Sequence, residues 1–238
     1  MDPDCPWVSG YVDYEWRHLR PLLAAYGIDP NAREVLEFGC NVGASGIVMA
    51  KLGARVTGVD VDPGAVDVAN ANIALNRVED RARAMHVADT RAMPFADEAF
   101  DLVIANSVLE YVPQPFLAGV MAEVHRVVRP GGLMLICGTS SRLSPREMHS
   151  RVWLVNYIPR IADRLTGRTP VRGLAPWDLR RAIAGRFVPE KADGWLAARK
   201  AVHGRVSLPV RLVDRLAGIA GIAPGWISPS MELLLRRI

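Results

Sequence analysis

Short apolar segments alternate with helical segments through the first half of this 238-residue chain. Runs of β-type residues occupy positions 34–38, 55–61, 84–87, 100–105 and 133–137, and the stretches between them suit helices. Apolar strands joined through helices predict a parallel sheet that is covered on both faces. In such α/β sheets ligands bind at the carboxyl ends of the strands, so the loops that follow these strands are expected to border one crevice.

Local signals define several of the helices. Asp62-Pro63 is a typical helix start, with Asp as the N-cap and Pro at the first position, and this helix is expected to reach about Asn76. A leading helix is expected over 14–26, with Pro21 as a weak point. The clearest helix carries one apolar stripe at helical spacing and ends before Pro130-Gly131-Gly132. The stripe consists of Leu117, Val120, Met121, Val124, Val127 and Val128.

The pattern changes after Gly138. Residues 139–175 have weak periodicity, 176–184 and 195–221 suit helices, and 186–191 and 231–236 suit strands. This order predicts a sheet whose late strands are interrupted by a helical cap. The expected division is an N-terminal helical lid over 1–32, a ligand-binding core over 33–138, and a cap with the closing strands over 139–238.

The net charge of +4 hides an asymmetry. Residues 1–138 hold 11 Lys and Arg against 18 Asp and Glu, a balance of −7, whereas residues 139–238 hold 18 against 7, a balance of +11. The C-terminal part is either a solvated basic face or faces an anionic substrate. Its arginines are scattered among few aromatic residues, which argues against a nucleic-acid partner.

Composition restricts location and partners. No apolar run approaches the ~18 residues that a membrane-spanning helix needs, so no membrane partner is expected. The three cysteines, Cys5, Cys40 and Cys137, lie far apart and have neither metal-binding nor disulfide spacing. We therefore expect a cytoplasmic protein without a metal, present as a monomer or homodimer.

A glycine loop follows the first strand, between Gly39 and Gly43. Small residues there let the backbone approach a ligand closely, and the helix that begins at Ala44 directs free N–H groups at it. Asp60, at the end of the second strand and 23 positions after Glu37, can accept both hydroxyls of a ribose. These features fit either a dinucleotide or S-adenosylmethionine.

Two details separate these two ligands. The dinucleotide fingerprint Gly-x-Gly-x-x-Gly is absent, because the spacing here is Gly39-x-x-x-Gly43 with Asn41 in the middle. Asn tolerates the left-handed conformation that such a loop requires. Glu37 places a carboxylate before the loop, which suits an ammonium group and repels a phosphate.

At these motifs the chain resembles the class I S-adenosylmethionine-dependent methyltransferases, and most closely their small-molecule branch, the quinone and natural-product methylases. In that branch a histidine commonly follows Leu-Glu, whereas this chain has Tyr111. The matching segments occur in family order over residues 33–138. They are Val35-Leu36-Glu37-Phe38-Gly39-Cys40-Asn41-Val42-Gly43, Val56-Thr57-Gly58-Val59-Asp60, Ala88-Asp89-Thr90, Met93-Pro94-Phe95, Phe100-Asp101-Leu102-Val103, Asn106-Ser107-Val108-Leu109-Glu110-Tyr111-Val112 and Arg129-Pro130-Gly131-Gly132.

The resemblance implies an α/β fold with a Rossmann-like, doubly wound and mostly parallel sheet, and S-adenosyl-L-methionine as the cofactor. It also implies a set of cofactor-binding positions. Glu37, Gly39, Asn41 and Gly43 would border the methionine part, Asp60 with Val61 the ribose, Asp89 with the Thr90 backbone the adenine, and Asn106 the sulfonium.

Candidate catalytic residues lie in the cap. If residues 149–160 are helical, one face presents His149, Trp153, Asn156, Tyr157 and Arg160. His149, with Tyr157 beside it, is then a candidate general base, and Arg160 an anion binder. Alternatively, Trp153 and Tyr157 only dock the cap on the sheet. On the N-terminal side, three aromatic residues can close over the sulfonium by cation–π contact or serve only as packing. They are Tyr11, Tyr14 and Trp16.

Three functions are compatible with these motifs. The first is methyl transfer to the O, N or C atom of a small molecule in biosynthetic or secondary metabolism, with an anionic molecule among the candidate acceptors. The second is cyclisation of the cofactor's own aminobutyl chain with release of methylthioadenosine, which a closed cap without room for an acceptor would indicate. The third is cofactor binding without catalysis, against which the intact motif series argues.

Overall fold

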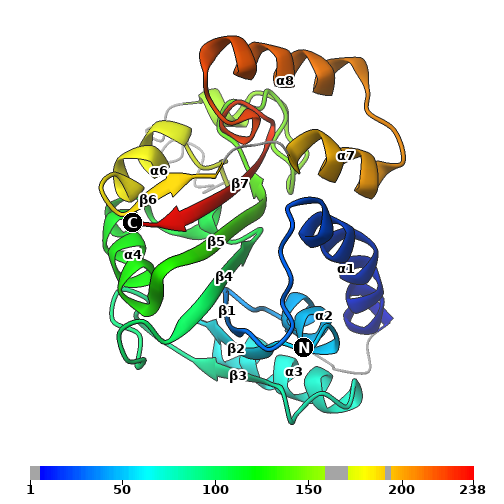
Figure 1. The fold of residues 1–238 in the computed structure, drawn as a ribbon, viewed down its shortest axis with the longest axis vertical. Coiled ribbons are helices and arrows are strands. Elements are labelled where there is room, and N and C mark those ends of the chain that lie inside the picture. The colour runs from blue at the N-terminus through cyan, green and yellow to red at the C-terminus, as the bar shows by residue number, and fades with distance from the viewer. Residues whose placement is uncertain (1–5, 159–170, 191–193) are drawn as a thin grey trace.

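In the computed structural model, residues 6–158, 171–190 and 194–238 are described (Figure 1). They form a seven-stranded sheet of order β3-β2-β1-β4-β5-β7-β6, in which the first five strands are parallel and β7 is antiparallel to both neighbours. The predicted Rossmann-like α/β fold is thereby confirmed. The strands are β1 Glu34–Phe38, β2 Arg55–Asp60, β3 Ala82–His86, β4 Phe100–Asn106, β5 Val128–Ser140, β6 Phe187–Pro189 and β7 Ser230–Arg237.

Helices cover both faces of the sheet (Figure 1). One face packs against α1 (Pro6–Ala25), α2 (Ala44–Lys51) and α3 (Pro63–Leu75), and the other against α4 (Gln114–Val127) and α6 (Pro176–Ile183). Two further helices, α7 (Trp195–His203) and α8 (Leu208–Ala220), lie beyond the end of β5 and the start of β7, with α7 beside α1. No helix among the described residues is both long and apolar enough to cross a bilayer.

Each strand–helix unit follows from its sequence. The β1 and β4 side chains are almost all buried, as expected for central parallel strands. The α3 helix starts as predicted, because Asp62 accepts a hydrogen bond from the Gly64 N–H at 2.8 Å and Pro63 follows. On α4 the predicted apolar stripe is buried from Leu117 to Val127.

Several predicted boundaries were wrong. The leading helix begins at Pro6 rather than at residue 14, and Pro21 lies within it. The β3 strand starts at Ala82 because it pairs in register with β2 from Val56 onward. The fifth strand starts at Val128, immediately after α4, and continues to Ser140 because β7 pairs along it. Long-range pairing therefore set these limits, which local propensity did not indicate.

Candidate active site

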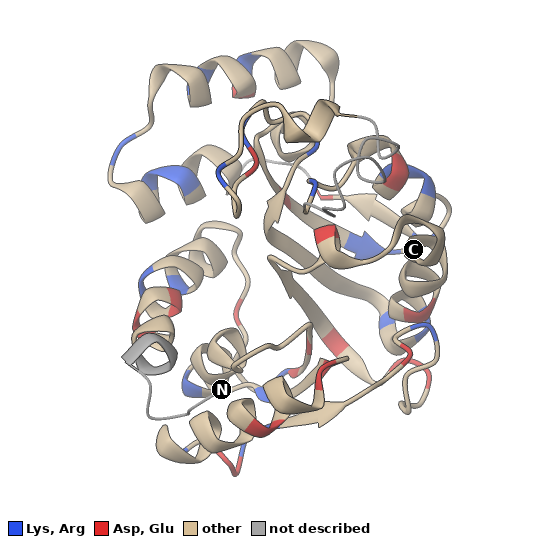
Figure 2. Cartoon of the chain, turned by 180° about the vertical axis from the view of Figure 1, so that it is seen from behind, with Lys and Arg blue, Asp and Glu red and all other residues tan. Residues whose placement is uncertain are grey.

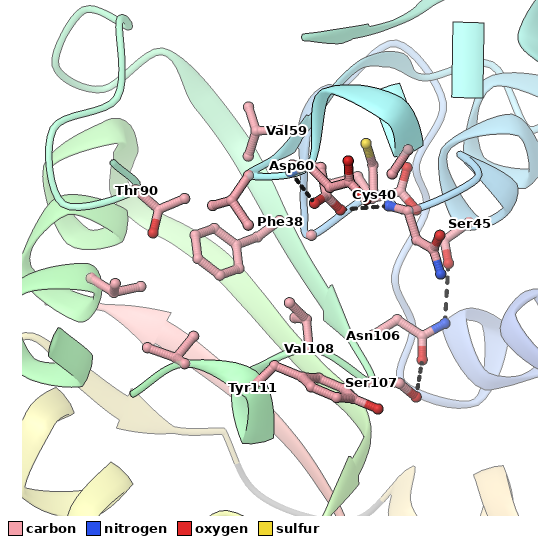
Figure 3. A pocket seen from close by; sticks show the side chains of 18 of the residues that line it. Phe38, Cys40, Ser45, Val59, Asp60, Thr90, Asn106, Ser107, Val108 and Tyr111 are labelled. Carbon is pink, nitrogen blue, oxygen red and sulfur yellow. Dashed lines mark hydrogen bonds between the residues drawn. The ribbon is translucent and has the colours of Figure 1, made fainter. Parts of the chain in front are cut away.

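A cavity of about 920 Å³ opens at the carboxyl ends of β1, β2 and β4 (Figure 3). Its walls include the loops that follow these three strands and the loop that follows β3. The prediction that these loops border one crevice is confirmed. The volume lies at the upper end of the range for small-molecule sites.

The glycine loop has the left-handed backbone that its sequence predicted. The φ angles are +73° at Gly39, +46° at Asn41 and +74° at Gly43. A Cβ atom on Gly39 would lie 2.1 Å from Cγ2 of Val108, so only glycine fits beside the β4 loop. Gly43 does not line the cavity, and its backbone instead forms the start of α2.

Asp60, the last residue of β2, lies on the cavity wall beside Cys40 of the glycine loop (Figure 3). Its Oδ2 accepts a hydrogen bond from the Asn41 N–H at 2.8 Å, and its Oδ1 accepts one from the Asp62 N–H at 3.0 Å. These bonds fix the carboxylate while leaving each oxygen a further acceptor position. Val61 follows on the cavity wall and is 58% exposed.

Two buried carboxylates lie near the inner end of the site. Glu37 is 4% exposed and its Oε2 accepts a hydrogen bond from the Gly46 N–H at 3.0 Å. Glu15, on α1, is 3% exposed and is hydrogen-bonded to Asn106 and Tyr11. Burial raises the pKa of Glu37 to about 8 and that of Glu15 to about 7. Neither carboxylate belongs to an ion pair formed by the described residues. Glu15 was missed at the sequence level, although it follows Tyr11 by one helical turn.

The raised pKa of Glu37 predicts a pH dependence of stability. Between about pH 4.5 and 8 the buried acid keeps its proton in the folded protein and loses it on unfolding, so stability falls as pH rises. Glu37→Gln should therefore flatten the fall in Tm over this range, measured by calorimetry on the ligand-free protein. Glu34→Gln, at a more exposed position of β1, is the matched control. Equal slopes for Glu37→Gln and the unmodified protein would contradict the prediction.

Asp89 lies on the cavity wall, but its carboxylate is already engaged. Its two oxygens accept hydrogen bonds from the Arg91 guanidinium, each at 2.8 Å. These bonds lower the pKa of Asp89 to about 2. The sequence motif did not indicate this ion pair. Because Arg91 already occupies both oxygens, the Asp89 carboxylate has less capacity to accept a hydrogen bond from an adenine amino group. Thr90 lines the same wall.

A second cavity of about 380 Å³ adjoins the first, between α1, α7 and the ends of β4, β5 and β7. Four residues line both cavities: Tyr11, Asn106, Ser107 and His149. Asn106 donates a hydrogen bond to Ser45 Oγ at 3.1 Å and accepts one from Ser107 Oγ at 3.4 Å (Figure 3). Tyr14 lines only the second cavity and stacks on Tyr11, whereas Trp16 lines neither.

The prediction that residues 149–160 form a helix is wrong for the described residues of this range. Arg151 and Leu154 have left-handed backbone conformations that prevent a continuous helix, and only the 3-10 turn η2 (Val155–Tyr157) forms. The proposed helical face therefore does not exist. Asn156 is buried, Trp153 is 64% exposed, and Arg160 lies outside the described residues.

The two predicted catalytic side chains are separated. His149 lines both cavities, and its Nε2 lies 2.7 Å from Oε1 of Glu110, a residue that sequence analysis did not assign. Tyr157 lines neither of these two cavities, and its hydroxyl donates to the Leu143 carbonyl at 2.7 Å. The structure thus brings only His149 to the site.

Residues 36–136 match the methyltransferase domain family. This segment contains most of β1 and β5, all of β2 to β4, and the loops after β1 to β4 that border the large cavity. Over this segment the chain is therefore similar to a methyltransferase domain. The rest of the chain adds α1, the segment after β5 and the two antiparallel strands to this domain.

Two curated relatives match parts of the chain. It is 36% identical over 101 residues to a sterol 4-C-methyltransferase of Caenorhabditis elegans, covering 42% of this chain and 29% of the relative. It is 29% identical over 162 residues to a demethylmenaquinone methyltransferase of Tropheryma whipplei, covering 67% and 62%. The chain thus matches less than two thirds of the length of either relative.

The fold is also that of solved methyltransferases. Geranyl diphosphate C-methyltransferase from Streptomyces coelicolor, solved with S-adenosyl-L-homocysteine, superposes with a TM-score of 0.57 at 15% identity. The superposition covers 96% of this chain and 78% of that one.

The residues of the large cavity fit the methyltransferase domain's cofactor, S-adenosylmethionine. Glu37 in the cavity wall and Glu15 in the adjoining second cavity lack a cationic partner among the described residues, and the cofactor's ammonium group would supply one. The glycine loop leaves its backbone open to a ligand, and Asp60 offers its remaining acceptor positions to a ribose.

Proposed function

We propose that this chain is an S-adenosylmethionine-dependent methyltransferase that acts on a small molecule held in the second cavity. The observation that carries the proposal is the common wall of four residues between a cofactor-sized cavity and a smaller one. In this arrangement residues 33–138 hold the methyl donor, residues 1–32 close over it, and residues 139–238 shape the acceptor site.

Bound S-adenosylmethionine supplies an electrophilic methyl group on a cationic sulfur. Toward it, Glu37 and the neighbouring Glu15 would bind the ammonium group, Asp60 would bind the ribose hydroxyls, and Val61 and Thr90 would line the nucleoside end. Asn106 is fixed by its hydrogen bonds at the wall between the cavities, where the reacting atoms would meet. Holding both partners in line there lowers the barrier by proximity and orientation.

The size and charge of the second cavity indicate the acceptor class. About 380 Å³ suits a small molecule or part of one, in agreement with the sterol and demethylmenaquinone named for the relatives. Arg199 is the one Lys or Arg that lines this cavity among the described residues, and it pairs with Glu232 at 3.1 Å. The other basic residues described after β5 are spread over the segment that follows β5, over α6, α7 and α8, and over β7 (Figure 2). We therefore propose an uncharged acceptor rather than the anionic one that the overall charge suggested.

The same cavity favours methyl transfer over cyclisation of the cofactor. Cyclisation needs no second substrate, whereas the described residues of α1, α7 and β7 enclose a space beside the donor site. Mass spectrometry of the purified protein with S-adenosylmethionine, alone and with a panel of small acceptors, tests the proposal. We expect S-adenosylhomocysteine to form only when an acceptor is present. Methylthioadenosine formed without an acceptor would overturn the proposal.

A further inference from the structure

His149 is paired with a carboxylate that the chain buries completely. The Glu110 side chain is 0% exposed, and its Oε1 lies 2.7 Å from His149 Nε2 and accepts the Ser140 N–H at 3.1 Å. Its Oε2 is also buried and has no hydrogen-bond partner among the described residues. Burying a carboxylate with one oxygen unpartnered is unfavourable, so the contact with His149 is the main compensation for that charge.

Both partners are held by the backbone around them. Glu110 lies in the 3-10 turn η1 (Leu109–Tyr111). This turn follows the end of β4 and the residues after it that line the large cavity. The His149 N–H donates to Oε2 of Glu147 at 2.9 Å, which fixes the backbone at His149 within the segment after β5. The Tyr111 ring lies 5.8 Å from the imidazole, centroid to centroid. The pair is therefore positioned from two segments that are distant in sequence.

The contact with Glu110 decides which imidazole nitrogen can act as a base. A proton on Nε2 is shared with the carboxylate, so Nδ1 carries the free lone pair of the neutral ring. The ring itself lines both the donor cavity and the acceptor cavity. This is the arrangement of a general base oriented by a carboxylate.

Building on the proposed function, we propose that His149 is the general base for an acceptor hydroxyl and that Glu110 is its positioning residue. The acceptor class is then a molecule with an acidic hydroxyl, such as a phenol or enol, methylated on oxygen. The acceptor oxygen forms a bond to the methyl carbon as the carbon–sulfur bond breaks and its electron pair stays on sulfur. The hydroxyl proton passes to Nδ1 of His149 and then to water.

The electrostatic surroundings set the expected pH profile. Hydrogen bonding to Glu110 raises the pKa of His149, so the base is unprotonated only above that pKa and the rate should rise with pH through it. Removing the Glu110 charge should lower this pKa and move the rising limb toward acid. The other ionisable groups that face His149 or line one of its two cavities are Tyr11, Tyr14, Glu15, His18, Glu37, Cys40, Asp60, Asp62, Asp89, Arg91, Tyr111, Cys137, Glu147, Arg199, His203 and Glu232.

The experiment compares the unmodified protein with Glu110→Gln, His149→Gln and the control His125→Gln, which alters a histidine of α4 outside both cavities. Substituted phenols, alkylamines and carbon acids serve as acceptors, with S-adenosylhomocysteine and the methylated product measured by mass spectrometry. The His149 ring is titrated by NMR without any acceptor, and donor affinity is measured by calorimetry. We expect phenol ethers, a loss in kcat of about 10²–10⁴-fold in His149→Gln, and an acid shift of both the NMR titration and the kcat profile in Glu110→Gln.

Each alternative outcome has a separate meaning. An unmoved His149 titration in folded Glu110→Gln would overturn the pair, whatever the acceptor. Transfer to amines or carbon acids only, or to none of the phenols, would overturn the hydroxyl assignment. Failure of the unmodified protein to bind S-adenosylmethionine would instead overturn the proposed function. If Glu110→Gln does not fold, Glu110→Ala, which also removes the charge, serves in its place, and an unchanged titration there counts equally against the pair.

Discussion

Asp60→Ala is expected to weaken S-adenosylmethionine binding by about 1–3 kcal/mol, roughly a 5- to 150-fold rise in Kd. The substitution removes the charged acceptor proposed for the ribose hydroxyls. It also leaves the Asn41 and Asp62 N–H groups without the oxygens to which they now donate. Isothermal titration calorimetry measures the affinity directly, without any acceptor.

Two further variants separate these effects. Asp60→Asn retains a side-chain carbonyl and should lose less affinity than Asp60→Ala. Asp67→Ala removes an equal charge from an exposed position on α3 that does not line the cavity, and should leave Kd unchanged within about twofold. An unchanged Kd in Asp60→Ala would remove this residue from the donor site.

Gly39→Ala is expected to destabilise the protein by about 2–5 kcal/mol. Placing a Cβ on a left-handed residue costs about 1–2 kcal/mol. The overlap with Val108, 2.1 Å from the new atom, adds about 1–3 kcal/mol of overpacking. The free energy of unfolding from urea denaturation gives the total, and the same backbone shift should weaken donor binding.

Gly131→Ala is the matched control for Gly39→Ala. Its φ is +74°, almost equal to that of Gly39, but nothing lies within 4 Å of its added Cβ. It should therefore show only the conformational cost, and Val108→Ala in the Gly39→Ala background should recover part of the difference. Equal losses for Gly39→Ala and Gly131→Ala would show that close packing at Val108 contributes nothing.

The sheet and the large cavity could be predicted because their signals are local. Strand–helix alternation and the glycine loop define the positions of Asp60 and Asn106, since parallel strands bring their carboxyl ends together. Asn41 shows the same principle in one residue, because its tolerance of positive φ was predicted and is observed. Each of these features depends on a few neighbouring residues and on strand order.

The partners of these residues could not be predicted, because they come from distant parts of the chain. Glu15 reaches the site from α1, and Glu110 meets His149 across 39 positions of sequence. The prediction for the segment after β5 assumed a helix. Instead, hydrogen bonds from backbone N–H groups to side chains hold this segment in an irregular conformation, for example those from His149 and Ser150 to the Glu147 carboxylate. Helical periodicity therefore grouped residues that the structure separates.

The wall of Tyr11, Asn106, Ser107 and His149 between the two cavities has a kinetic consequence. A methyl group that passes directly from one cavity to the other never rests on the protein, so both substrates must be bound together. Initial velocities should then give intersecting rather than parallel double-reciprocal lines. A methyl group made chiral with hydrogen isotopes should reach the product with inverted configuration. One displacement at carbon inverts the configuration, and no second displacement follows that would restore it.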